Sequence, residues 1–102
     1  MFKIGVLVSG GGTNLQAIID SINNGIIKDA KIETVVSNKE DAFALQRAKN
    51  NNIETKVLKI KDFENKQLYE NALIEYLKSK ELDLIVLAGF MVILSENFVN
   101  NF

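Results

Sequence analysis

The chain has 102 residues, of which 47% are hydrophobic, and its 12 basic and 13 acidic residues leave a net charge of −1. This length fits one domain with its own core, and the balanced charge gives no reason to expect a nucleic-acid or membrane partner. Cys and His are both absent, which excludes thiolate chemistry, histidine acid–base catalysis and the commonest transition-metal ligands. The start of the chain lacks the layout of a signal peptide and no apolar stretch reaches membrane-spanning length, so we expect a cytoplasmic protein without a metal.

Four apolar runs predict β-strands at residues 3–8, 31–36, 53–58 and 84–88. The last of them is almost free of polar residues, as expected for a strand with both sheet faces covered. Apolar residues at helical spacing predict helices at residues 15–23, 41–50 and 63–79. Asn23, Asn24 and Gly25 provide a C-terminal stop for the first helix.

This alternation of strands and helices predicts an α/β protein with a Rossmann-like, doubly wound, predominantly parallel sheet. Ligands of such sheets bind beyond the carboxyl ends of the strands, at the point where the strand order reverses. The glycine-rich turn after the first strand and the turn Ala88-Gly89-Phe90 after the fourth are therefore expected to be neighbours in one site.

The first of these turns is the clearest ligand signal in the sequence. It reads Ser9-Gly10-Gly11-Gly12-Thr13-Asn14. Adjacent glycines permit positive φ angles and close approach of a ligand to the backbone. The free N–H groups and the dipole of the following helix favour an anion, most often phosphate. Asn14 is the expected N-cap of that helix. The alternative is a tight turn with no ligand.

Known phosphate motifs narrow the kind of site. No Lys-Ser/Thr pair follows Gly12, which argues against a nucleoside triphosphatase. Leu15 stands where a dinucleotide fingerprint needs its third glycine, and Ser37-Asn38 stands where it needs an acidic residue. Flavodoxin-like loops are closer in composition, so a stand-alone module that binds FMN or a phosphosugar remains an open alternative.

Three other features have a structural reading. Ser37-Asn38-Lys39 reads as a cap and turn. The apolar residues 90–94, beyond the end of a predicted strand, are either a buried continuation of the core or the wall of a pocket for an aromatic ligand. Lys66 reads from its surroundings as a solvated helix residue.

Four blocks together resemble the phosphoribosylglycinamide formyltransferase family, which is also called glycinamide ribonucleotide transformylase. The blocks are residues 6–18, 36–39, 41–43 and 87–91. The resemblance runs from residue 1 to residue 102 and identifies this stretch as the N-terminal part of a formyltransferase domain. It implies transfer of a formyl group from 10-formyltetrahydrofolate, as cosubstrate, to glycinamide ribonucleotide in de novo purine synthesis.

The resemblance also implies roles for particular residues. Gly12, Thr13 and Asn14 would hold the substrate phosphate, and Gly89 would lie close to the substrate. The residues implied for folate binding are Lys66, Phe90, Met91, Val92, Ile93, Leu94 and Val99. Two of them depart from the family pattern, because Val92 and Lys66 each replace an Arg that is common at that position.

The family's catalytic Asn and His lie in an Asn-x-His-Pro-Ser segment just beyond the position of Phe102, and its catalytic Asp follows later. No catalytic residue is therefore assigned to this chain, which we expect to be inactive by itself. We also expect the fourth strand to have an unpaired edge. The chain is then expected to self-associate, or to pair with a second chain that supplies the rest of the sheet.

Overall fold

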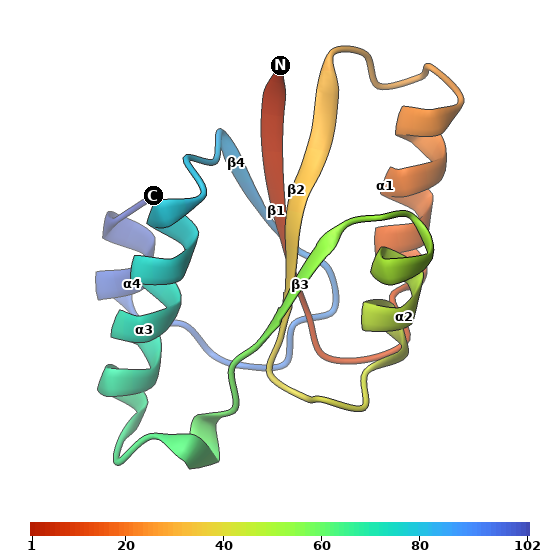
Figure 1. Ribbon diagram of the computed structural model, residues 1–102. Helices are drawn as coiled ribbons and strands as arrows, with labels where there is room; N and C mark the ends of the chain where they lie inside the picture. Colours follow the sequence, from red (N-terminus) through yellow and green to blue (C-terminus); the bar gives the residue numbers. More distant parts are fainter.

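A computed structural model describes residues 1–102 as a four-stranded parallel sheet with helices on both faces (Figure 1). The strand order is β3-β2-β1-β4, and every neighbouring pair is parallel. Along the chain the elements are β1 (Phe2–Val8), α1 (Thr13–Asn23), β2 (Ala30–Ser37), α2 (Phe43–Asn50), β3 (Glu54–Val57), a 3₁₀ turn η1 (Ile60–Asp62), α3 (Lys66–Ser79), β4 (Leu84–Leu87) and α4 (Glu96–Asn100). The predicted fold class is confirmed.

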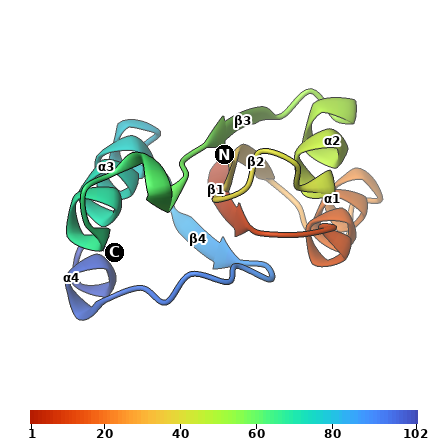
Figure 2. The same ribbon diagram turned by 90° about the horizontal axis from the view of Figure 1, so that it is seen from below.

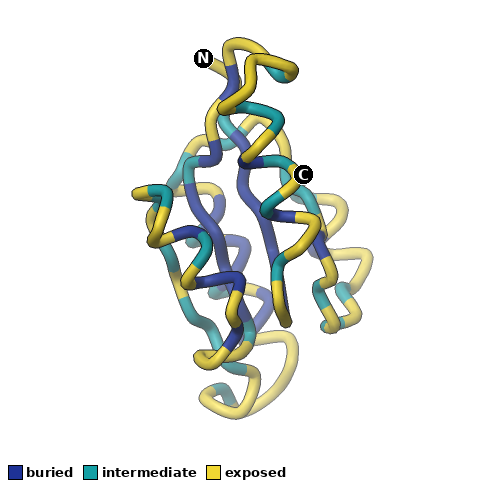
Figure 3. Tube along the Cα trace, turned by 90° about the vertical axis from the view of Figure 1, so that its right-hand side faces the viewer, coloured by how far each residue is buried: buried dark blue, intermediate teal, exposed yellow.

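The helices form two layers. Viewed from below, α1 and α2 lie on one side of the sheet, and α3 and α4 lie on the other (Figure 2). Successive side chains of a strand point to opposite faces, so β1 contributes to both layers. Val6 and Val8 pack in the cluster with α1 and α2, whereas Leu7 packs in the cluster with α3 and Phe98 of α4. The buried residues concentrate along the central strands, and the outer turns are exposed (Figure 3).

Helix boundaries differ from the sequence predictions where capping decides them. Helix α3 begins at Lys66 rather than at residue 63, because the side chain of Asn65 accepts a hydrogen bond from the Leu68 N–H at 2.9 Å and caps the helix there. Helix α2 begins at Phe43 rather than at residue 41. The predicted stop of α1 is confirmed: the helix ends at Asn23, and Gly25 follows with φ of 77°.

Strand β4 corrects one prediction. It was expected to be covered on both faces, but Leu84 and Leu87 are 45% and 55% exposed. The strand order explains the difference, because β4 pairs only with β1 and its other edge has no neighbour. The predicted unpaired edge is therefore present, beside an exposed apolar surface.

No helix of the structure combines the length and the apolar character needed to cross a membrane.

Candidate anion and cosubstrate site

Three loops meet at the carboxyl end of the sheet. They follow β1, β2 and β4, and the views of Figures 1 and 2 place them at the same end of the strands. The β4 loop begins beside the glycine turn, because the Ala88 N–H donates to the Leu7 carbonyl at 2.9 Å. The predicted neighbourhood of the two turns is confirmed.

Gly12 is the residue that shapes the first loop. It is the N-cap of α1, with φ of 78° and ψ of 30° in the left-handed region. A Cβ at this position would lie 2.6 Å from the Ala44 Cβ, which is closer than real contacts allow. Both its backbone conformation and the space around it therefore require glycine. A Cβ added at Gly10 or Gly11 would meet no atom within 4 Å, and neither residue has a positive φ.

The beginning of α1 corrects the predicted cap. The helix starts at Thr13, two residues earlier than an Asn14 cap would place it, and no side chain caps it. Its first backbone bond runs from the Gln16 N–H to the Gly12 carbonyl at 2.8 Å. The N–H groups of the first turn consequently have no partner inside the helix. Thr13 and Asn14 are exposed and the first turn has no acidic residue, so the geometry and charge suit an anion.

Helix α2 is hydrogen-bonded to the glycine loop. The Ala44 N–H donates to the Gly10 carbonyl at 3.1 Å. Arg47 donates from Nε to the Gly11 carbonyl at 2.7 Å and from Nη1 to Gln16 Oε1 at 3.2 Å. Two loop carbonyls are thus bonded to α2. Sequence reasoning missed Arg47; the available signal was that it is the only Arg in a chain otherwise supplied with Lys.

Ser9 links all three loops through one buried hydroxyl. The Ser9 Oγ donates to Asn38 Oδ1 at 2.6 Å and accepts from the Met91 N–H at 2.8 Å. The interpretation of residues 37–39 as a turn is confirmed, because the Ser37 hydroxyl bonds to the backbone of Lys39. Asn38 has the additional contact with Ser9, which sequence reasoning missed.

Residues 90–94 alternate between core and solvent. Phe90, Val92 and Leu94 are half-buried and pack against the cluster on the α3 side of the sheet. Met91 and Ile93 are 77% and 82% exposed, so the interpretation of the whole stretch as buried core is wrong for these two residues. Gly89 precedes the stretch with φ of 72°, a conformation that favours glycine.

Lys66 and the end of this loop share a buried carboxylate. Glu70 is only 3% exposed, and its Oε2 accepts from the Ser95 N–H at 3.1 Å. The Ser95 hydroxyl donates to its other oxygen. The Lys66 Nζ lies 3.9 Å from Glu70 Oε2, with 44% of the Lys side chain exposed. Lys66 therefore lies next to the end of the 90–94 stretch.

Val99 has different surroundings from the other predicted residues. It lies on α4, is 62% exposed, and lines a shallow hollow with Leu84 and Leu87 of β4. This hollow is part of the exposed surface beside the free sheet edge and has no residue of the glycine turn in its lining.

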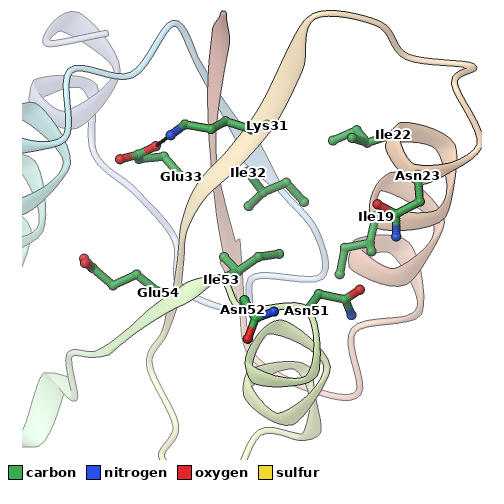
Figure 4. Close-up of a pocket in the computed structure, with 10 residues that line it drawn as sticks. All are labelled: Ile19, Ile22, Asn23, Lys31, Ile32, Glu33, Asn51, Asn52, Ile53 and Glu54. Atoms are coloured by element: carbon green, nitrogen blue, oxygen red, sulfur yellow. Dashed lines mark ion pairs between the residues drawn. The ribbon is translucent and has the colours of Figure 1, made fainter.

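A second hollow lies at the other end of the sheet (Figure 4). It has a volume of about 420 Å³ and is lined by the end of α1, the beginning of β2 and the segment around β3. Lys31 and Glu33 form an ion pair of 2.9 Å at its rim, and the hydrogen bond from Lys31 lowers the pKa of the Glu33 carboxyl. None of the residues predicted for ligand binding lines it.

No group of three or more His, Cys, Asp or Glu side chains is placed to hold a metal ion. The clearest pKa shifts also belong to groups away from the three loops. A hydrogen bond from Lys80 lowers the pKa of Glu54 on β3. Burial raises the pKa of Tyr76, a residue of α3 whose hydroxyl bonds to Glu54. Burial also raises the pKa of Tyr69 to about 12. None of the groups with a shifted pKa lies in the three loops.

Comparisons with known proteins agree on one family. The sequence profile described as "Formyl transferase" matches residues 2–102. A phosphoribosylglycinamide formyltransferase of Haemophilus influenzae is 50% identical over 102 residues, covering 100% of this chain and 48% of the relative. The solved phosphoribosylglycinamide formyltransferase of Coxiella burnetii has a TM-score of 0.93 and 40% identity, covering 97% of this chain and 46% of its own. A glycinamide ribonucleotide transformylase from Symbiobacterium toebii has a TM-score of 0.94 and 34% identity, covering 100% and 48%. The chain spans about half the length of these proteins.

Proposed function

Because the chain belongs to the formyl transferase family, we propose that residues 1–102 are the N-terminal, substrate-anchoring part of a phosphoribosylglycinamide formyltransferase domain. The activity concerned is transfer of a formyl group from 10-formyltetrahydrofolate to the amine of glycinamide ribonucleotide in purine synthesis. The observation that carries the proposal is the Gly12 loop, where the uncapped N–H groups at the start of α1 suit an anion. The chain is 50% identical in sequence to an enzyme whose substrate has a phosphate.

In this proposal, the turn of Gly12, Thr13 and Asn14 binds the ribonucleotide phosphate. The uncapped N–H groups of α1 donate to phosphate oxygens, and the exposed Thr13 and Asn14 side chains add donors. Arg47 supports the loop from the opposite side and adds a positive charge nearby.

The segment after β4 forms part of the cosubstrate pocket. Gly89 lets the backbone pass close to the substrate, and residues 90–94 contribute apolar surface for the flat pterin ring of the folate. The exposed Met91 and Ile93 side chains are free to contact a ligand, whereas Phe90, Val92 and Leu94 anchor the segment to the core. Lys66 supplies a cation for the folate carboxylates. Val99 lies at the margin of this cosubstrate pocket.

Formyl transfer also needs groups that this chain does not contain. The substrate amine attacks the formyl carbon, the bond from that carbon to N10 of the folate then breaks, and N10 leaves as the protonated amine of tetrahydrofolate. A donor must stabilise the intermediate oxyanion, and an acid–base group must carry the proton from the attacking amine to N10. The sequence has no His, and no catalytic residue is assigned to it. We propose that these groups come from a C-terminal part of the domain that packs on the free edge of β4.

Binding of the phosphate is the first test. Titration of glycinamide ribonucleotide into the ¹⁵N-labelled chain should give saturable amide shifts at Gly12, Thr13 and Asn14. Asn14→Leu should weaken this binding by about tenfold, because a donor to a charged oxygen is lost. Asn24→Ala, at the other end of α1, is the matched control. A chain that binds FMN and ignores the ribonucleotide would instead be the flavodoxin-like module considered above.

Complementation tests the activity itself. A polypeptide with the remaining C-terminal residues of the Haemophilus influenzae relative should restore formyl transfer when it is mixed with this chain. Each polypeptide alone should be inactive. If the two associate and phosphate binds but no formyl group is transferred, the proposed reaction is wrong while the binding site stands.

A further inference from the structure

The buried hydroxyl of Ser9 joins the two loops that carry the proposed ligand sites. Ser9 is 4% exposed and lies between the end of β1 and the glycine turn. Met91 is 82 residues away in sequence, yet its N–H donates to the Ser9 Oγ at 2.8 Å. This bond connects the backbone of the β4 loop to the first residue of the phosphate loop.

The two hydrogen bonds of the Ser9 hydroxyl can form in only one direction each. A backbone N–H can only donate, so the Ser9 oxygen must accept from Met91. The hydroxyl proton is then free to point at Asn38 Oδ1, 2.6 Å away on the loop after β2. Ser9 therefore uses both its donor and an acceptor site, and its orientation is fixed from two sides.

We propose that Ser9 is a positioning residue that couples the phosphate loop to the cosubstrate loop. This inference rests on the proposed function. Phosphate binding orders the turn that starts at Ser9, and the bond to Met91 transmits this ordering to the segment that begins at Gly89. No other hydrogen bond joins a residue of the glycine turn 9–14 to the 90–94 stretch. Binding of the ribonucleotide thereby prepares the surface that receives the folate.

Amide resonances of the ¹⁵N-labelled chain test the coupling, with ribose 5-phosphate as the probe. In the unmodified chain the Met91 amide should shift with the same saturation curve as the Gly12 and Thr13 amides. In Ser9→Ala the Gly12 and Thr13 shifts should remain, and the Met91 response should disappear. Hydrogen exchange at Met91 should become about tenfold faster, the factor expected for loss of one part-buried hydrogen bond.

Two variants separate this role from a general loss of structure. Thr34→Val removes another fully buried hydroxyl from the neighbouring strand, where it bonds to Tyr76, and should leave the Met91 response intact. Asn38→Ala removes the acceptor of the Ser9 proton but keeps the bond from Met91, so exchange at Met91 should rise by a smaller factor than in Ser9→Ala.

The outcomes distinguish this inference from the proposed function. If Gly12 and Thr13 do not respond to ribose 5-phosphate, the phosphate site itself is wrong. If they respond while Met91 does not, or if Met91 responds equally in Ser9→Ala, the site stands and the coupling through Ser9 is overturned.

Discussion

At the scale of single residues, three neighbouring glycines have unlike roles. Sequence reasoning treated Gly10, Gly11 and Gly12 as one flexible unit, because nothing in a run of identical residues tells them apart. The structure assigns the left-handed conformation and the close contact with Ala44 to Gly12 alone. The distinction depends on the position of α2, which lies some thirty residues further along the chain.

Substitution by alanine should expose this difference. Gly12→Ala combines a strained φ with a collision and should lower the free energy of unfolding by about 2–4 kcal/mol. Gly11→Ala meets open space and should change it by less than about 0.5 kcal/mol. Urea denaturation of the two variants measures both effects. Equal losses would show that the turn does not depend on the conformation of Gly12.

The residues that hold the loops were not identified from the sequence. Ser9 and Arg47 act through partners at Met91 and Gly11, which become neighbours only when the sheet and α2 are assembled. The phosphate turn itself was recognisable, because its glycines and its place between a strand and a helix follow local rules. The sequence thus predicted a ligand-binding turn, but not which side chains support that turn.

At the scale of elements, periodicity predicted every strand and the three long helices. Helix α4 was missed because its five residues are too few for a helical repeat to be visible, and they follow directly on an apolar stretch. The exposure of β4 was also missed, because apolar composition cannot tell a covered strand from one whose cover is absent. The other edge strand, β3, differs in composition: it carries Glu54 and Lys56, charges that discourage pairing with another chain.

The free edge of β4 should make the isolated chain self-associate. Sedimentation equilibrium at a few hundred micromolar should give an apparent mass above the 11.4 kDa of the monomer. Leu87→Lys places a charge on the exposed edge and should restore the monomer mass. Ile26→Lys removes an equally apolar, 76% exposed side chain far from the edge and should leave association unchanged. A monomeric unmodified chain at this concentration would contradict the prediction.

At the scale of the whole molecule, Tyr69 makes stability depend on alkaline pH. Its side chain is fully buried between α3 and the sheet, its ring meets that of Phe63 edge to face, and its hydroxyl has no hydrogen-bond partner. Burial raises the pKa of this hydroxyl from 10.0 to about 12. The folded chain therefore holds the proton more tightly than the unfolded chain does, and its contribution to stability is complete below pH 10.

Raising the pH from about 10 to about 12 should therefore destabilise the chain by roughly 2–3 kcal/mol through Tyr69. Tyr69→Phe should remove this part of the loss and, at pH 7, should leave stability unchanged or raise it by up to about 1 kcal/mol, because no hydrogen bond is lost. Urea denaturation at several pH values compares the two chains. The two chains differ only in this hydroxyl, so an identical pH dependence would contradict the assignment to Tyr69.

The strand order has a consequence for synthesis of the chain. β1 is the first strand to leave the ribosome, yet it occupies an interior position of the sheet, between β2 and β4. Its β2 side is paired soon afterwards, but β4 begins about 75 residues later, which at typical translation speeds corresponds to about 4–15 s. During that interval a nascent chain presents one unpaired backbone edge of a largely apolar strand to the surrounding cell. A chaperone that binds extended apolar segments therefore has a defined period in which to capture it.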